Sequence, residues 1–363
     1  MEDRSGSDGA RATDGSSGAA TTRVDAVAST ASGIGSMPGD DFNDSFQVVL
    51  GEVGDLPFLP ELPARGTSAS MVGRTLGLVG ELGVDLQPAG WRLTDAPSAD
   101  QRRARSLLAQ DLDTVEELCQ GRADFFKVQV VGPWTLAAHV ERPRGDKVVG
   151  DHGARRDLAQ ALAEGVRQHV ADVRRRLGGD ASVVVQFDEP ALPTVLAGGV
   201  PTASGFSRHR SVTAADAAQT LDWLDEAVVS SGATSLVHCC APDVPVAMLR
   251  ETSIPALSFD LSLVTRPQYE DLAEWVDAGR ALWPGVVPAV DPAGTPPGEV
   301  DLTNRVLGWW SALGFSEAET VPATVVTPAC GLAGASPGWA RTALSLAERV
   351  ARNLSEGEGR MDP

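Results

Sequence analysis

The chain has no long hydrophobic run, and it is short of positive charge. No stretch of about 18 apolar residues occurs anywhere in the 363-residue sequence, so no transmembrane span is expected. Lys and Arg number 30 against 49 Asp and Glu, which gives a formal net charge of −19. This charge disfavours duplex nucleic acid and anionic membrane surfaces as partners, because both would repel the protein.

Cysteine is scarce as well, and a secretory start is absent. The four cysteines of the chain are not spaced like a disulfide framework. The N-terminus lacks the charged residues followed by an apolar stretch that mark a secretory signal. Both absences predict a cytoplasmic protein whose thiols stay reduced and remain available for chemistry.

Large apolar residues are almost missing from the two ends of the chain. Residues 1–32 are rich in Gly, Ser, Ala, Thr and Asp, so burial cannot offset the entropy of ordering them. We expect a disordered tail there and a flexible C-terminus of similar composition at residues 355–363. Residues 33–354 contain no linker and no short-period repeat, and we expect them to form one domain.

Between these ends, strand-like and helix-like segments alternate. Several strand candidates consist of β-branched and other apolar residues, as expected of parallel strands that are buried on both faces. The segments between them carry apolar stripes at helical spacing, clearest from Leu158 through Leu162 to Val166. The strand candidates are residues 32–36, 83–88, 125–131, 182–187, 235–240, 256–261, 286–290 and 324–328.

Eight strands that alternate with helices predict an α/β protein whose single domain is a (β/α)8 TIM barrel. A doubly wound open sheet is the alternative, but no glycine-rich phosphate-binding fingerprint follows the first strand. In a barrel, the carboxyl ends of all strands meet at one mouth, where active sites form. Polar residues that are unusual for buried strands occur at these ends: Ser36, Asp188, Glu189, His238, Cys240, Asp260, Asp291 and Cys330.

A histidine and several thiols at two of these strand ends predict a metal site. His238-Cys239-Cys240 ends one apolar run, and Cys330 ends a later one. Thiolate and imidazole are ligands that zinc prefers, and three protein ligands leave a position open for substrate. Because side chains alternate along a strand, His238 and Cys240 point the same way, whereas Cys239 faces the helices. The alternative is that the thiols pack in the core, as free cysteines often do.

Three carboxylates near the same mouth are candidates for ligand and substrate binding. Asp260 could supply a fourth, oxygen ligand to the metal, or it could simply cap a helix or a turn. Asp188 and Glu189 follow a buried strand, where a carboxylate can receive a substrate ammonium group. Solvation of a loop is the alternative for these two acids.

The turn at Ile34-Gly35-Ser36 exposes backbone N–H groups that could hold a carboxylate, although alone it is only a turn signal. Trp134 follows the third strand, and we expect it to pack under a loop and not to stack on a ligand. The remaining histidines have no partners at ligand spacing and are interpreted as surface or helix residues: His139, His152, His169 and His209.

Five motifs occur in an order that resembles a known family. They are Ile34-Gly35-Ser36, Gly132-Pro133-Trp134-Thr135, Asp188-Glu189-Pro190-Ala191, His238-Cys239-Cys240 and Pro328-Ala329-Cys330-Gly331-Leu332. The order resembles that of the C-terminal catalytic barrel of cobalamin-independent methionine synthase, over roughly residues 34–350. We therefore expect a single-barrel relative without the separate N-terminal barrel of the full-length enzymes.

The resemblance implies a zinc-dependent methyltransferase that forms methionine from homocysteine. It implies four zinc ligands, with an aspartate where the family has a glutamate: His238, Cys240, Asp260 and Cys330. It also implies that Asp188 holds the homocysteine amine, and that the turn of Ile34, Gly35 and Ser36 holds the homocysteine carboxylate.

Two departures from the family concern the methyl donor. Gln87-Pro88-Ala89-Gly90 stands after the predicted second strand, where the family has a His-Gly-Glu segment that helps to bind folate and homocysteine. The segment after the seventh strand lacks the histidine that assists proton transfer. We expect Asp291 or Glu189 to act as the acid for a methyltetrahydrofolate-type donor.

Two alternatives to this function remain open from the sequence. One is a thiol methyltransferase that takes the methyl group from a corrinoid protein or from another non-folate donor. The other is a zinc-free enzyme similar to uroporphyrinogen decarboxylase, which belongs to the same superfamily.

Overall fold

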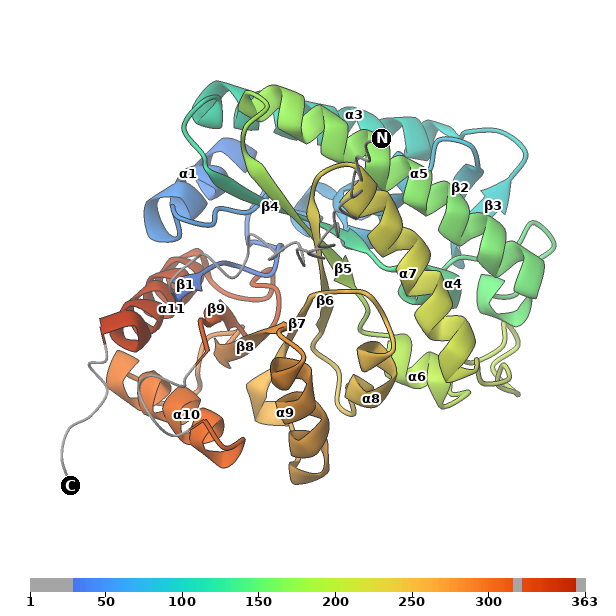
Figure 1. The fold of residues 1–363 in the computed structure, drawn as a ribbon. Coiled ribbons are helices and arrows are strands. Elements are labelled where there is room, and N and C mark those ends of the chain that lie inside the picture. The colour runs from blue at the N-terminus through green and yellow to red at the C-terminus, as the bar shows by residue number, and fades with distance from the viewer. Residues whose placement is uncertain (1–28, 316–321, 357–363) are drawn as a thin grey trace, which may run out of the picture.

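The computed structural model describes residues 29–315 and 322–356. Most of the predicted tails, residues 1–28 and 357–363, lie outside the described residues. The fold is α/β: parallel strands curl through the middle of the molecule and helices surround them on the outside (Figure 1). Within the described ranges, no helix combines the length and the apolar character needed to pass through a bilayer.

Seven strands form the curled sheet, and every neighbouring pair in it is parallel. In the order of their hydrogen bonding they are β1 (Thr30–Ala31), β9 (Val325–Pro328), β8 (Ala281–Val287), β7 (Ala256–Asp260), β6 (Thr234–Cys239), β5 (Ser182–Asp188) and β4 (Phe125–Val131). The strands predicted from residue 125 onwards are therefore present, with β8 beginning at Ala281 instead of residue 286.

The first strand differs from its prediction. β1 comprises Thr30 and Ala31, which pair with Val325 and Val326 of β9, so the sheet begins inside the segment predicted as a disordered tail. The small residues of this segment are ordered because their backbone groups complete the edge of β9, with Thr30 N donating to Thr324 O at 3.1 Å.

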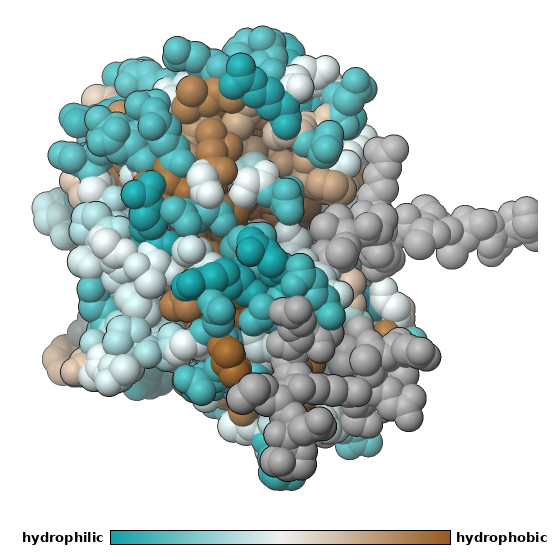
Figure 2. Space-filling model, turned by 90° about the vertical axis from the view of Figure 1, so that its left-hand side faces the viewer, coloured by the Kyte–Doolittle hydropathy of each residue, from teal (hydrophilic) through white to brown (hydrophobic). Residues whose placement is uncertain are grey.

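Helices cover the outer face of the sheet. They are α1 (Phe42–Glu52), α2 (Met71–Leu78), α3 (Ala99–Cys119), α4 (Pro133–His139), α5 (His152–Leu177), α6 (Leu192–Leu196), α7 (Ala214–Ser230), α8 (Val246–Arg250), α9 (Tyr269–Asp277), α10 (Glu299–Ala312) and α11 (Pro337–Glu356). Figure 2 shows mostly hydrophilic side chains on the face that carries α1 and α11, with a smaller group of hydrophobic ones toward its top. The apolar faces of the helices are accordingly turned toward the sheet.

Local sequence explains where these helices begin and end. The Asp151 side chain accepts a hydrogen bond from Ala154 N at 2.9 Å and starts α5. Gly178 ends the same helix in the left-handed conformation, with φ of 101°. Leu158 and Leu162 lie on its buried stripe, as the spacing predicts. Thr213 starts α7 in the same way, by accepting from Asp216 N at 3.1 Å.

Residues 83–88 contain a strand, as predicted, but the prediction that this strand belongs to the barrel is wrong. They form β2 (Gly83–Gln87), which pairs antiparallel with β3 (Gly90–Thr94) in a separate two-stranded sheet. Gly90 adopts φ of 120° at the turn, a conformation that favours glycine and returns the chain on itself. The hairpin partner lies next in sequence, so this strand does not enter the parallel sheet.

Residues 56–61 lie instead between β4 and the chain that follows β1. Lys127 N donates to Pro57 O at 2.8 Å and Leu59 N donates to Lys127 O at 2.9 Å, which bridges this segment to β4. Glu61 N donates to Gly35 O at 3.0 Å on the other side. Prolines interrupt the pattern of N–H donors, so the segment forms isolated bridges and no continuous strand.

Inward-facing side chains are layered along the strands. An apolar cluster fills the amino-terminal end, and its buried members are Leu56, Val184, Leu236, Ala256, Trp283 and Val325. The next inward positions are polar and buried, among them Lys127, Gln186 and Ser258. Because side chains of a strand alternate, the following inward positions are Asp188 and Cys240, at the carboxyl ends of β5 and β6. Polar groups therefore collect at one end of the sheet.

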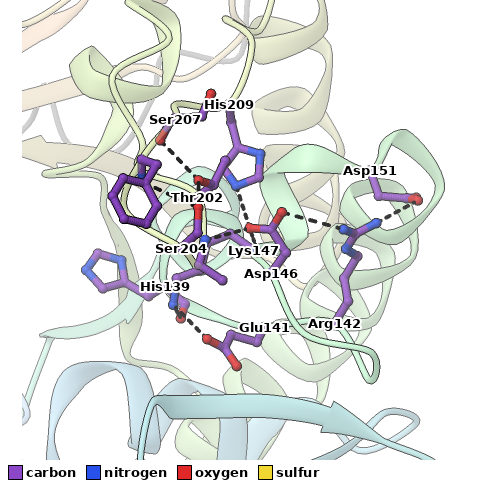
Figure 3. A network of polar contacts seen from close by, with 12 residues as sticks. His139, Glu141, Arg142, Asp146, Lys147, Asp151, Thr202, Ser204, Ser207 and His209 are labelled. Carbon is purple, nitrogen blue, oxygen red and sulfur yellow. Dashed lines mark hydrogen bonds and ion pairs between the residues drawn. The ribbon is translucent and has the colours of Figure 1, made fainter.

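Asp146 joins the loop after α4 to the loop after α6 (Figure 3). Its Oδ1 contacts His209 Nε2 at 2.9 Å and accepts from Ala203 N at 3.1 Å. Asp146 itself has φ of 68°, in the left-handed region that Asp tolerates better than most residues. An open surface hollow of about 780 Å³ lies over these loops, and none of the predicted site residues lines it.

Replacing Asp146 by Ala should loosen the loop that contains Ala203. The change removes acceptors from two backbone N–H groups and from His209, and we expect a loss of about 1 kcal/mol of local stability. Hydrogen exchange of the Ala203 amide should become faster. Asp157→Ala is the control, because Asp157 makes only a surface pair with Arg156. Unchanged exchange at Ala203 would show that Asp146 does not hold the two loops together.

Candidate functional site

A cavity of about 410 Å³ opens at the carboxyl ends of the strands. It is lined by Ile34, Gly35, Ser36, Glu61, Pro63, Ser70, Met71, Asp188, Pro190, His238, Cys240, Cys330 and Gly331. Seven of the residues predicted for metal and substrate binding, Cys330 among them, thus share one cavity, since they follow strands that run in the same direction.

A histidine and two thiols form the most distinctive part of this cavity. The ligand atoms of His238, Cys240 and Cys330 all lie within 4.8 Å of one another, and the two sulfur atoms are 2.9 Å apart. Cys239, one residue away, is fully buried in the main core. The alternation of side chains along β6 thus selects Cys240 as the neighbour of His238 and turns Cys239 toward the helices.

The donor set of this cluster fits a zinc ion. His238 Nδ1 contacts Ser258 Oγ at 2.9 Å, which fixes the imidazole ring. Its other nitrogen, Nε2, is buried and has no hydrogen-bond partner in the described part of the chain. A buried ring nitrogen without a partner, beside two sulfur atoms, is the arrangement of a metal ligand with an outer hydrogen bond on its second nitrogen.

The two thiols shift each other's pKa in opposite directions. The contact between the two sulfur atoms and the nearby His238 together lower the pKa of Cys330 to about 4, against the raising effect of burial. The same contact and burial raise the pKa of Cys240. Metal binding requires both sulfurs as thiolates, so it would release the proton of Cys240.

Asp260 does not join this cluster. It ends β7, and its Oδ1 accepts from Ser262 N at 2.8 Å and from Ser262 Oγ at 2.7 Å. The carboxylate starts the short 3-10 helix Leu261–Leu263, which was the alternative to a ligand role. The carboxylate predicted from the sequence as the fourth zinc ligand therefore contacts Ser262 and not the cluster.

Two buried carboxylates face the cavity across from the thiols. Asp188 Oδ1 accepts from Gln186 Nε2 at 2.7 Å, and burial raises the pKa of Asp188 well above its usual value. Glu61 lies 3.4 Å from Arg74 Nε, and burial raises its pKa as well, against the lowering effect of Arg74. The cavity therefore offers two acids whose ionisation responds to a cation placed beside them.

The turn of Ile34, Gly35 and Ser36 packs tightly against its surroundings. A Cβ atom on Gly35 would lie 2.7 Å from the Gln129 side chain, so a larger residue would displace the turn. A Cβ atom on Gly331 would lie 2.1 Å from Ser36 Oγ. These close approaches favour glycine within the turn, at Gly35, and beside it, at Gly331 next to Cys330.

Glu189 points away from the cavity. Its carboxylate accepts from Trp134 N at 2.9 Å, from Thr135 N at 2.8 Å and from Thr135 Oγ1 at 2.7 Å, at the start of α4. Gly132 permits this approach, since a Cβ atom there would lie 2.3 Å from Glu189 Oε1. Burial raises the pKa of Glu189 to about 7 in spite of these hydrogen bonds. These contacts support a structural role for Glu189 at the start of α4, and Glu189 does not line the cavity.

Asp291 also lies outside the cavity lining. Its carboxylate accepts from Ser336 N at 2.7 Å and from Ser336 Oγ at 2.6 Å, just before α11. These hydrogen bonds hold the pKa of Asp291 below its usual value, so it is a poor proton donor. These contacts do not support the role predicted for Asp291 as an acid. The sequence could not show this, because the position of a residue after a strand does not tell which way its side chain turns.

Two functional candidates were missed by the sequence reasoning, namely Glu61 and Lys127. Glu61 ends the apolar segment of residues 56–61, and the prolines of this segment concealed its strand-like pattern. Lys127 lies in the middle of a predicted buried strand, where a lysine is unusual. That position was the available signal for a buried charge near the site.

The family model described as the catalytic domain of cobalamin-independent synthase matches residues 121–353, more than half of the chain. This result speaks against the corrinoid protein considered as a donor. A comparison with curated protein sequences found no match.

A solved structure shows a similar fold. A B12-independent methionine synthase from a Shewanella species, in complex with selenomethionine, is 14% identical and has a TM-score of 0.59. The match covers 92% of this chain and 99% of that one. A prolidase also matches at 12% identity over 79% of this chain and 72% of that one, but its TM-score of 0.28 supports no inference.

Replacing Glu189 by Gln tests its structural role through pH. Glu189 has a pKa of about 7 in the folded protein, against a usual value of 4.5, so the folded state binds the proton more tightly than the unfolded state does. The stabilising effect of this group is therefore complete below pH 4.5 and is lost as the pH rises through 7. The stability advantage of wild type over Glu189→Gln should shrink from pH ~5 to pH ~8 by on the order of 3 kcal/mol, at ~1.4 kcal/mol per pKa unit.

Urea unfolding of both proteins at the two pH values measures this difference. An equal difference at both values would contradict the pKa assignment. A loss of turnover with no change in stability would return Glu189 to a catalytic role.

Proposed function

Because the chain belongs to the cobalamin-independent synthase family, we propose that it transfers a methyl group to the thiol of homocysteine and forms methionine. The observation that carries this proposal is the cluster of His238, Cys240 and Cys330, which shares one cavity with Asp188 and with the Ile34-Gly35-Ser36 turn. A thiol-binding group and groups for an ammonium and a carboxylate together match an amino acid that carries a thiol.

The fold supports the proposal as one (β/α)8 barrel domain. Residues 56–61 bridge β4 on one side and the chain after β1 on the other, which supports the proposal that they take the place of an eighth strand in a closed barrel. The domain then includes residues 30–356, and its mouth is the cavity at the carboxyl ends of the strands.

His238, Cys240 and Cys330 would hold a zinc ion. When bound, zinc favours the thiolate form of a coordinating substrate sulfur at neutral pH. The residues of the chain itself bind and orient the amino acid, and one acid supplies a proton. Ser258 holds the His238 ring, and three protein ligands would leave a bound zinc ion one open position for the sulfur of homocysteine.

Asp188 would accept the ammonium group of homocysteine, and the turn at Gly35 and Ser36 would hold its carboxylate. Holding both groups places the sulfur of the amino acid at the thiol cluster, and such orientation accounts for much of the rate. The selenomethionine in the Shewanella enzyme has the skeleton of the product, which supports an amino acid as ligand.

The methyl donor in this proposal is a methyltetrahydrofolate-type compound. The homocysteine sulfur attacks the methyl carbon and loses its proton, while the carbon–nitrogen bond of the donor breaks and the nitrogen takes up a proton. Glu61 is the better candidate for this proton than Asp291 or Glu189, because it faces the cavity and burial raises its pKa.

The affinity for zinc should depend on the residues of the cluster and on Ser258. Cys330→Ser should lose zinc affinity by more than the roughly 10- to 100-fold that loss of an outer partner costs, and Ser258→Ala should lose about that amount. Cys119→Ser is the control, because Cys119 is buried on α3 away from the cavity. Competition with a chelator, read by metal analysis, measures the affinities. Full zinc binding by Cys330→Ser would remove the metal assignment.

Asp188→Asn should weaken binding of the substrate ammonium. Losing a hydrogen bond to a charged group costs about 1.5–3 kcal/mol, so the KM for homocysteine should rise roughly 10- to 100-fold. Methionine has no thiol to titrate, and its affinity for wild type should increase with pH as Asp188, whose pKa is raised, loses its proton. Calorimetry between pH ~5 and pH ~8 measures this.

Asp291→Asn is the matched control, with an unchanged KM expected. A pH dependence of methionine binding that persists in Asp188→Asn would show that another group titrates.

A further inference from the structure

Lys127 is fully buried one layer below the cavity, although the chain contains only two lysines. Its Nζ donates to Ile34 O at 2.9 Å and to Gln186 Oε1 at 2.9 Å. The ammonium group also lies 5.5 Å from the centre of the Phe58 ring. Lys127 therefore touches the turn proposed to bind the substrate carboxylate, yet it does not line the cavity.

No carboxylate pairs directly with Lys127 among the residues that the structure describes. Burying an ammonium group without an ion pair is costly, and the groups around it must compensate. Its contacts here are a backbone carbonyl and a side-chain amide. An apolar side chain of similar length would fill the same space without this cost, so packing alone does not account for a lysine.

The contacts of Lys127 determine which way the Gln186 amide faces. An ammonium group can only donate, so the oxygen of the amide must face Lys127. The amide nitrogen then faces two acceptors, Ile34 O at 2.9 Å and Asp188 Oδ1 at 2.7 Å. If the amide turned over, its oxygen would face both acceptors and repel them.

We propose that Lys127 is a positioning residue that acts through Gln186 and gives the site its selectivity for thiols that carry an ammonium group. It fixes the carbonyl of Ile34 at the carboxylate-binding turn and, through the Gln186 amide, the carboxylate of Asp188. This inference rests on the proposed function, because the ammonium group it concerns is that of the homocysteine substrate.

Lys127→Met in the full-length, zinc-replete protein tests the inference. Kinetics are compared for homocysteine and for 4-mercaptobutanoate, which lacks only the ammonium group. Wild type should prefer homocysteine in kcat/KM, and Lys127→Met should reduce this preference at least tenfold, mainly through the KM for homocysteine. Zinc content and kcat should change little. A variant with a general structural defect would lose both.

Two further variants make the test specific. Gln186→Leu should lose the same preference while Lys127 is retained, and it serves as the second test if Lys127→Met does not fold. Lys147→Met removes the other lysine, which lies on a loop near His139 O and Glu141, and should change nothing. Retention of the wild-type preference in Lys127→Met or in Gln186→Leu would overturn the inference.

A readout independent of substrate separates this inference from the proposed function. If wild type methylates neither thiol, the proposed function fails, and a crystal structure of Lys127→Met still decides the positioning role. Displacement of the Asp188 carboxylate from its wild-type position would support that role. An unchanged contact of 2.7 Å between Gln186 Nε2 and Asp188 Oδ1 would refute it.

Discussion

The alternation of side chains along parallel strands is the constraint on which the site depends. Strands that run in one direction bring their carboxyl ends to the same edge, and every second side chain faces inward. In β6 this selects His238 and Cys240. A shift of one residue would present Val237 and Cys239 instead, and the ligand cluster would be lost. The register of β6, held by β5 and β7, is thus as necessary as the ligands themselves.

Buried charges around the cavity are arranged to offset one another. Glu61 and Asp188 are negative when ionised, and Lys127 and Arg74 supply positive charge nearby. Burial raises the pKa of both carboxyls and lowers that of Lys127 to about 7, so each group depends on its neighbours to stay charged. A zwitterionic amino acid adds one charge of each sign, and its binding leaves this balance unchanged.

Strands buried on both faces could be predicted from sequence because their apolar runs have few other interpretations. β4 agrees with its predicted bounds, and β5, β6, β7 and β9 differ by a residue at one or both ends. The hairpin of β2 and β3 could not be separated from a barrel strand, since pairing between strands is a tertiary property. Residues 56–61 were missed because prolines remove the donors that define a strand.

The thiol and histidine positions were predictable because their chemistry is specific, whereas carboxylates were not. Asp188 faces the cavity and Glu189, its neighbour in sequence, starts α4. Asp260 and Asp291 each accept from a nearby serine. An aspartate or glutamate after a strand serves equally well as a cap or as a ligand, and only the surrounding backbone decides between these roles.

The apolar cluster around Trp283 fills the amino-terminal end of the sheet, whereas the cavity opens at the carboxyl ends of the strands. Under the proposed function, homocysteine and the methyl donor would both reach the thiol cluster from this end. The packed amino-terminal end of the sheet thus sets the side from which ligands can approach the cluster.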